Sequence, residues 1–350
     1  MINTTELLAE LTVRLANEEL IAIDTEFMWR NTYYPKLCLI QIATSNNTYL
    51  IDPLYGMDLS PLKEILEDKN IVKIFHAASH DIKILHREIG ATTFPIFDTQ
   101  IAAEFLGIIH QGSLKHLLSH LQIANIEKNE KLSDWSERPL SKAQQQYAKE
   151  DVKFLISCCS HLEEKLKEQQ KLSWFYSESR YLIENELYQD SDPRLAYKKI
   201  KSSRKLKLEE RYKLKKLAEL RELVSRNKNK IPRRVISDEK LVYLSCLCNP
   251  TLQDLPNCLI KNTTCNINLL IDDILFTKNN IKVTKLKKID MDILDKMYSK
   301  LKILSDQLSI IPQLIASKKD LKLFLKNDPN ISKKFNVNWR KRLIEQIIIK

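Results

Sequence analysis

The chain has 350 residues, of which 43% are hydrophobic and 29% are charged, a composition typical of a globular protein. This length allows two or three domains with their own hydrophobic cores, without disulfides to hold them together. The net charge is +11, but residues 194–240 alone hold 18 Lys and Arg against 6 Asp and Glu, so the basicity belongs to one segment.

The seven cysteines are odd in number and contain no C-x-x-C pair, so neither a disulfide framework nor a zinc site is indicated. This cysteine usage fits a reducing cytosol. Acidic residues, among them Glu6, Glu10 and Glu18, interrupt the N-terminal region, which therefore lacks the apolar stretch of a signal peptide. No apolar run approaches the length of a membrane span. We therefore expect a cytoplasmic protein without a membrane partner.

Strands and helices alternate in the first half of the chain. Strands are expected at residues 21–26, 36–43, 48–52, 71–76 and 94–97. Helices are expected at residues 5–17, about 60–67, 79–89 with Ser79 as N-cap, 98–105 and 141–167. The first three strands predict an antiparallel meander, and the later alternation predicts parallel additions. The result is a mixed sheet with helices on its faces, followed by a helical second half without glycine.

Two carboxylates stand in the predicted strand 21–26, which is otherwise rich in apolar and β-branched residues. Side chains alternate along a strand, so Asp24 and Glu26 point to one face and Thr25 points to the other. Two like charges on one face repel each other unless a cation lies between them. The pair therefore indicates half of a divalent-metal site, with a solvated edge strand as the alternative.

The other half of such a site comes from three residues that lie much later in the chain. Asp81 falls in the first turn of the helix expected after strand 71–76, where an acid also complements the helix dipole. Tyr147 and Asp151 are four residues apart in the helix 141–167 and share one of its faces. Each feature alone is also typical of a capped or solvated helix. The order strand-D-x-E, strand-helix-D and helix-Y-x-x-x-D is much more specific than any single part.

In this order the chain resembles the DEDD superfamily of 3′ to 5′ exonucleases, in the subclass with tyrosine, and most closely the ribonuclease D family. The resemblance covers about residues 1–190. The matching stretches are Asp24-Thr25-Glu26-Phe27, Thr32 to Leu37, Phe75-His76-Ala77 with Asp81, Phe97 to Gln100, Asp134-Trp135, Arg138-Pro139-Leu140 and Tyr147 to Val152. The resemblance implies an α/β ribonuclease H-like fold and a catalytic set made of Asp24, Glu26, Asp81, Tyr147 and Asp151.

The resemblance also implies two divalent metal ions, Mg²⁺ or Mn²⁺. Two cations about 4 Å apart supply the hydroxide and stabilise the leaving alkoxide of a phosphodiester, and carboxylates are the ligands that such ions take. By resemblance, Asp24 bridges the two ions, while Glu26 and Asp151 hold the ion beside the nucleophile. Asp81 supports the other ion through water, and Tyr147 orients the attacking water.

Two more residues are candidate contacts for the nucleic acid. Phe27 directly follows the metal strand, where it either stacks on a terminal base or packs at the strand end. Arg138 either touches a phosphate or pairs with nearby Asp134. His76, at the end of a predicted buried strand, is expected to be a structural residue.

The composition and the pattern of the sequence change beyond residue 190. Asp192-Pro193 breaks the chain, and after the basic segment a helix is expected at about 206–225 and another after Ser237. This region resembles the helicase and ribonuclease D C-terminal (HRDC) domain, a small helical bundle that contacts nucleic acid, although Leu220-Arg221 stands where the family usually has Trp-Arg.

A second and more diverged HRDC-like copy is expected from about Met291, with a capping box at Ser317 to Asp320 and with Asn338-Trp339-Arg340 near its end. The expected domains are therefore the exonuclease domain at 1–190, a basic linker at 191–205, an HRDC-like domain at 206–285 and a diverged HRDC-like domain at 286–350.

Together these features predict a metal-dependent 3′ to 5′ exoribonuclease that releases nucleoside 5′-monophosphates and trims tRNA precursors and other RNA 3′ ends as a monomer. A DNA 3′ to 5′ exonuclease is the first alternative, disfavoured because no polymerase or helicase segment accompanies the domain. A nucleic-acid-binding protein without activity is the second, and the intact set of acids and tyrosine speaks against it.

Overall fold

The computed structural model describes residues 1–126, 133–184, 188, 190–247 and 291–348. The chain divides into two compact units. The first unit contains residues 1–28, 37–189 and 286–350, and the second contains residues 29–36 and 190–285. The C-terminal segment thus groups with the N-terminal region, which no local sequence pattern indicates.

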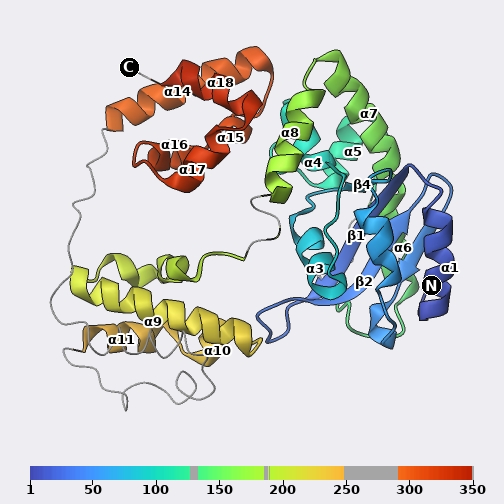
Figure 1. Cartoon of the computed structure of the whole chain (residues 1–350), viewed down its shortest axis with the longest axis horizontal. Helices are drawn as coiled ribbons and strands as arrows, with labels where there is room; N and C mark the ends of the chain where they lie inside the picture. The colour runs from blue at the N-terminus through green and yellow to red at the C-terminus, as the bar shows by residue number, and fades with distance from the viewer. Residues whose placement is uncertain (127–132, 185–187, 189, 248–290, 349–350) are drawn as a thin grey trace. The chain divides into compact units, whose positions relative to one another are not determined.

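A five-stranded mixed sheet organises the first unit (Figure 1). The strands are β1 (Leu20–Met28), β2 (Lys36–Ala43), β3 (Thr48–Ile51), β4 (Val72–Phe75) and β5 (Ile96–Asp98). They lie in the order β3-β2-β1-β4-β5, with β2 antiparallel to β3 and with β4 parallel to both β1 and β5. The expected mixed sheet is confirmed, and its central strand is the one that carries Asp24 and Glu26.

Among the described residues before 185, eight α-helices accompany this sheet. They are α1 (Thr5–Leu15), α2 (Pro61–Glu67), α3 (Ser79–Ile89), α4 (Thr99–Phe105), α5 (Leu114–His120), α6 (Lys142–Lys153), α7 (Leu155–Glu168) and α8 (Leu172–Leu182), with a 3₁₀ turn η1 (Pro53–Tyr55).

Two of these helices differ from the prediction. Ser79 is the first residue of α3 rather than its N-cap, and Ala78 at the cap position makes no side-chain hydrogen bond. The single long helix expected at 141–167 is two helices, because Phe154 ends α6 and α7 begins at the next residue.

Helices cover both faces of the sheet, because successive residues of each strand point to opposite faces. Ile21 and Ile23 of β1 join the apolar cluster to which α1, α2 and α3 contribute. Ala22 joins a second cluster with α4, α5, α7 and α8. By the same alternation Asp24 lies on the Ala22 face, and Thr25 lies on the Ile23 face.

The C-terminal helices of the first unit are α14 (Met291–Leu308), α15 (Pro312–Ile315), α16 (Lys318–Phe324), α17 (Pro329–Phe335) and α18 (Asn338–Ile347). They share the apolar cluster of α4, α7 and α8. Glu178 of α8 accepts hydrogen bonds from Trp339 Nε1 at 3.1 Å and from Arg340 Nη2 at 2.6 Å, and all three side chains are buried. The predicted capping box of Ser317 and Asp320 is confirmed.

The second unit contains η3 (Pro193–Lys199), η4 (Lys201–Arg204), α9 (Leu208–Asn227), α10 (Pro232–Val235) and α11 (Asp238–Cys246). Leu217, Leu220 and Val224 lie in its core, as their helical spacing predicts. Ser237 caps α11 as expected. Much of the expected HRDC-like domain, residues 248–285, lies outside the described residues, and its identity stays a prediction.

Strands occur only before residue 99 in the described part of the chain, which agrees with the helical second half expected from the sequence. Among the described residues, no helix is both long enough and apolar enough to cross a membrane.

Candidate active site

Three carboxylates from two distant parts of the chain meet beside the central strand. Asp24 and Glu26 come from β1, and Asp151 comes from α6, which packs on β1. One ligand oxygen from each carboxylate lies within 4.8 Å of the other two. Asp151 is buried, whereas Asp24 and Glu26 are half-buried. The alternation along β1 and the packing of α6 together produce this cluster.

Helix α6 begins with a reciprocal cap between Ser141 and Gln144. Ser141 accepts from the Gln144 backbone N–H at 3.1 Å, and the Gln144 side chain accepts from the Ser141 N–H at 2.9 Å. Tyr147 and Asp151, one turn apart, are both buried on one face of the helix. The centroid of the Tyr147 ring lies 5.9 Å from that of the Trp135 ring. Both belong to a small apolar cluster that also contains side chains of β2 and β3.

Tyr147 lies in the field of all three carboxylates. Burial raises the pKa of its phenol, and the neighbouring charges of Asp151, Glu26 and Asp24 raise that pKa further, as does a hydrogen bond with Asp151. An ionised phenolate is therefore strongly disfavoured here. At neutral pH Tyr147 keeps its proton and acts as a hydrogen-bond donor, which makes it unsuited to serve as a general base.

Asp81 stands apart from the three clustered carboxylates. It lies in the first turn of α3, as expected, and is 6% exposed. Thr25 donates a hydrogen bond of 2.5 Å to its carboxylate. Burial raises the pKa of Asp81, and the Thr25 hydrogen bond lowers it in part. The structure thus brings together three of the four predicted acids, and the fourth is hydrogen-bonded to Thr25, the residue that lies between two of them.

The turn before α3 is held by Asp98, whose role the sequence did not reveal. Its carboxylate accepts from the backbone N–H groups of Ala77 at 3.0 Å and Ala78 at 2.9 Å, and from Gln100 N–H at the start of α4. Ala77 has a positive φ of 62°, a conformation that a non-glycine residue adopts only with support. An acid at the end of a strand and directly before a helix was the available signal. Asp98 therefore orients the helix that carries Asp81.

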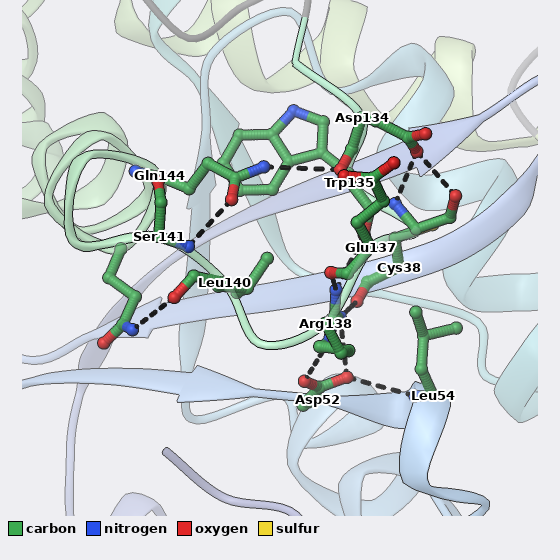
Figure 2. Close-up of polar contacts among 12 residues, drawn as sticks. Cys38, Asp52, Leu54, Asp134, Trp135, Glu137, Arg138, Leu140, Ser141 and Gln144 are labelled. Atoms are coloured by element: carbon green, nitrogen blue, oxygen red, sulfur yellow. Dashed lines mark hydrogen bonds and ion pairs between the residues drawn. The ribbon is translucent and has the colours of Figure 1, made fainter.

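The guanidinium of Arg138 is held by hydrogen bonds within the fold (Figure 2), and its expected phosphate contact stays a prediction. Its Nε and Nη2 donate to the two carboxylate oxygens of Asp52, and Nη2 also donates to the Cys38 carbonyl. Its Nη1 donates to the carbonyls of Trp135 and Glu137. A guanidinium has five N–H donors, and the fold uses each nitrogen. The ionic partner is Asp52, directly after β3, and not the expected Asp134.

The two remaining residues singled out from the sequence are placed as follows. Phe27 is half-buried on the α3 side of the sheet. The centroid of its ring lies 6.0 Å from that of the His80 ring, in a stacked arrangement. The ring nitrogens of His76 lie 2.9 Å from Thr99 Oγ1 and from the Gly112 carbonyl. His76 is therefore the structural histidine expected from the sequence, whereas a substrate contact by Phe27 stays a prediction.

The donor set at the cluster fits a divalent cation. Three carboxylates supply the hard oxygen ligands that Mg²⁺ and Mn²⁺ take. Their close approach also leaves a concentration of negative charge that a cation would compensate. In the described part of the chain, this is the one group of three such ligands close enough to hold a metal ion.

The chain is similar to known 3′-5′ exonucleases. A family model described as 3′-5′ exonuclease matches residues 1–167. Ribonuclease D of Desulfotalea psychrophila is 36% identical over 262 residues, which cover 75% of this chain and 70% of the relative. Ribonuclease D of Pseudomonas paraeruginosa is 35% identical over 235 residues, which cover 67% of this chain and 62% of the relative, less than two thirds of its length.

Two solved structures extend the comparison. The crystal structure of Escherichia coli RNase D, an exoribonuclease involved in structured RNA processing, matches with a TM-score of 0.84 and 25% identity over 99% of this chain and 97% of the other. The catalytic core of RRP6 from Trypanosoma brucei matches with a TM-score of 0.59 and 25% identity over 78% and 77% of the two chains.

Proposed function

The chain belongs to the ribonuclease D family of 3′-5′ exonucleases, and from this membership we propose that it shortens RNA from the 3′ end and releases nucleoside 5′-monophosphates. The observation that carries the proposal is the convergence of Asp24, Glu26 and Asp151 beside the protonated Tyr147. A catalytic set with these residue types suits phosphodiester hydrolysis, because that reaction needs cations at an anionic phosphorus and a positioned water.

We propose that Asp24, Glu26 and Asp151 hold two divalent metal ions, either Mg²⁺ or Mn²⁺. When bound, such ions lower the pKa of water and stabilise the charge that develops on the leaving oxygen. The cluster supports this role through its three carboxylates within reach of one another. Asp81 is proposed as the fourth acid on the strength of its place in the family motif.

The proposed task of Tyr147 follows from its ionisation. Because its pKa is raised, the hydroxyl keeps a proton at neutral pH and can donate it in a hydrogen bond. Asp151 accepts that hydrogen bond, which leaves the phenol oxygen to accept one from water, and the ring packs against Trp135. We therefore assign Tyr147 to the orientation of the attacking water, which contributes to rate by positioning.

Phe27 is proposed as the stacking platform for the terminal base. It is half-buried, so part of its ring is open, and it lies in β1 directly after Glu26. Aromatic rings bind single strands with little sequence preference, which suits an enzyme that removes successive nucleotides.

The proposed physiological substrates are tRNA precursors and other RNA 3′ ends, on which the chain would act as a monomer in the cytoplasm. The proposed modules are the exonuclease domain 1–190, the linker 191–205 and HRDC-like segments 206–285 and 286–350. The basic balance of residues 194–240 supports a nucleic-acid role for the first HRDC-like segment. The packing of α18 on α8 supports a structural role for the second.

One experiment separates this proposal from its alternatives. The purified full chain is incubated with RNA and DNA oligonucleotides of matched sequence, labelled at the 5′ end, with Mg²⁺ or Mn²⁺. We expect a ladder of RNA products shortened from the 3′ end and no cleavage of circular RNA. Faster degradation of DNA would favour the DNA exonuclease, and stable binding without products would favour the inactive binding protein. Cleavage of circular RNA would reject the exonuclease assignment.

A further inference from the structure

The second unit contains a cationic pocket that none of the catalytic features involves. It has a volume of about 320 Å³ and is lined by Tyr197, Lys198, Ser203, Arg204 and Arg211. Three of these five residues carry a positive charge and none carries a negative one. The pocket lies where η3, η4 and the first turn of α9 meet, within the basic segment 194–240.

Arg211 is built into the wall of this pocket rather than extending freely from it. Its Nε donates to the Ser203 carbonyl at 3.0 Å, and its Nη2 donates to the carbonyls of Arg204 and Leu206 at 3.1 and 3.0 Å. These contacts fix a half-buried guanidinium in one orientation. They use neutral acceptors, so they orient the charge without neutralising it.

No carboxylate neutralises the pocket within the described residues. Lys198, Arg204 and Arg211 are absent from the ion pairs there, whereas neighbouring Arg194 pairs with Asp192 at 2.8 Å and Arg221 pairs with Asp238 at 2.7 Å. A partly desolvated positive charge without a counter-ion is costly. A bound anion would remove that cost, and a guanidinium beside a lysine and a hydroxyl is a typical set for a phosphate oxygen.

We infer that this pocket binds a phosphate group of the nucleic acid that the chain degrades. The inference rests on the proposed function for the identity of the ligand. Tyr197, which is half-buried, adds an aromatic residue to the lining of the pocket. Because Arg211 is held in place by backbone carbonyls, the pocket is a fixed site for one phosphate. This distinguishes it from the diffuse attraction of the other lysines in the segment.

The test compares two double variants that lose the same charge from adjacent positions of the chain. Lys198→Gln with Arg204→Gln removes the two exposed cations of the pocket. Lys199→Gln with Lys205→Gln removes two exposed neighbours that do not line it. Binding of single-stranded RNA to the full chain is followed by fluorescence anisotropy as a function of salt, in EDTA so that no cleavage occurs. Equal melting temperatures exclude a folding defect.

We expect the pocket variant to weaken RNA binding by about tenfold at low salt and to flatten the log-log salt slope by about 0.7, the value for one lost phosphate contact on a single strand. The neighbour variant should change affinity less than threefold. At constant ionic strength, inorganic phosphate should displace RNA from the wild-type chain more effectively than chloride does, and this difference should disappear in the pocket variant.

Equal losses in the two variants would overturn the inference and assign the charge to diffuse attraction. A preference for RNA with a 5′-phosphate over RNA with a 5′-hydroxyl, lost in the pocket variant, would assign the site to a terminal phosphate rather than to the backbone. The outcome for the proposed function is read separately. Intact pocket binding with no RNA shortening by the metal-loaded wild type would reject the exoribonuclease and leave the phosphate site in place.

Discussion

Arg138 and Asp52 form a bidentate ion pair that joins the loop before α6 to the end of β3. Arg138 Nη2 lies 2.7 Å from Asp52 Oδ1, and Nε donates to the other oxygen, while Asp52 also accepts from Leu54 N–H at 3.2 Å (Figure 2). The same loop carries Trp135, against which Tyr147 packs. The ion pair therefore supports the helix that presents Tyr147 and Asp151.

Arg138→Ala is expected to lower the free energy of unfolding by about 3–5 kcal/mol, because it leaves the buried Asp52 carboxylate without its partner. Turnover should fall with little change in KM. Urea denaturation and steady-state kinetics on short RNA measure the two effects. Lys142→Ala, the loss of an exposed cation at the start of α6, is the matched control and should change stability by less than about 0.5 kcal/mol. Wild-type stability together with a raised KM would favour the predicted phosphate contact over the structural role.

Asp24→Asn is expected to reduce metal-dependent hydrolysis by at least about 10²–10³-fold while the fold and RNA binding are kept. The substitution removes one charge from the cluster without a change of volume. It also relieves repulsion among the three carboxylates, so the melting temperature in EDTA should stay equal or rise. Substantial metal-dependent cleavage by the purified variant would contradict the metal assignment.

Tyr147→Phe is expected to lower kcat by about 10–100-fold and to leave the Kd for RNA nearly unchanged, as for a group that positions water. Because the pKa of Tyr147 is raised above its ordinary value near 10, the phenol does not titrate between pH 6 and 9. The pH dependence of kcat should therefore have the same shape in both proteins. A rate equal to that of the wild type would leave Tyr147 as a packing residue.

Thr25→Val tests the contact between Thr25 and Asp81. Burial raises the folded-state pKa of Asp81 above its unfolded value near 4, so the folded chain holds more protons than the unfolded chain above that pH. The stabilisation that this extra proton on Asp81 gives the folded chain is therefore lost as the pH rises through the raised pKa. Loss of the 2.5 Å hydrogen bond raises the pKa further, so the variant should lose about 1–3 kcal/mol at pH 8.5 and less at pH 5.

Denaturation by urea in EDTA at the two pH values measures this difference. Asp81→Asn serves as the control, because it removes the titrating group and should make the loss on Thr25→Val independent of pH. An equal loss at pH 5 and pH 8.5 in the Thr25→Val protein would show that the hydroxyl acts by packing alone.

Trp339→Ala is expected to destabilise the first unit by about 3–5 kcal/mol, because the indole is 3% exposed and lies 4.9 Å from the Phe105 ring and 5.9 Å from the Trp174 ring. It also leaves Glu178 with one fewer donor. Thermal unfolding followed by circular dichroism measures the effect, and Trp339→Phe should recover part of the loss. An unchanged melting temperature would mean that the C-terminal helices do not stabilise the sheet region.

The sequence by itself determined the features that depend on neighbours along the chain. The alternation of β1 puts Asp24 and Glu26 on one face, and the spacing of four in α6 puts Tyr147 and Asp151 on another. The capping of α6 by Ser141 is equally local. These interactions span at most four residues, so the order of residue types is sufficient to predict them.

Only the tertiary structure decided the contacts between segments far apart in the chain. Arg138 has Asp52 as its partner, 86 residues away, and not the nearby Asp134. Asp81 faces Thr25 from α3, and Glu178 binds Trp339 and Arg340 across more than 160 residues. Such pairings depend on which helices pack on which face of the sheet. A buried charge takes its partner from whatever side chain that packing brings near, and this leaves no periodic pattern in the sequence.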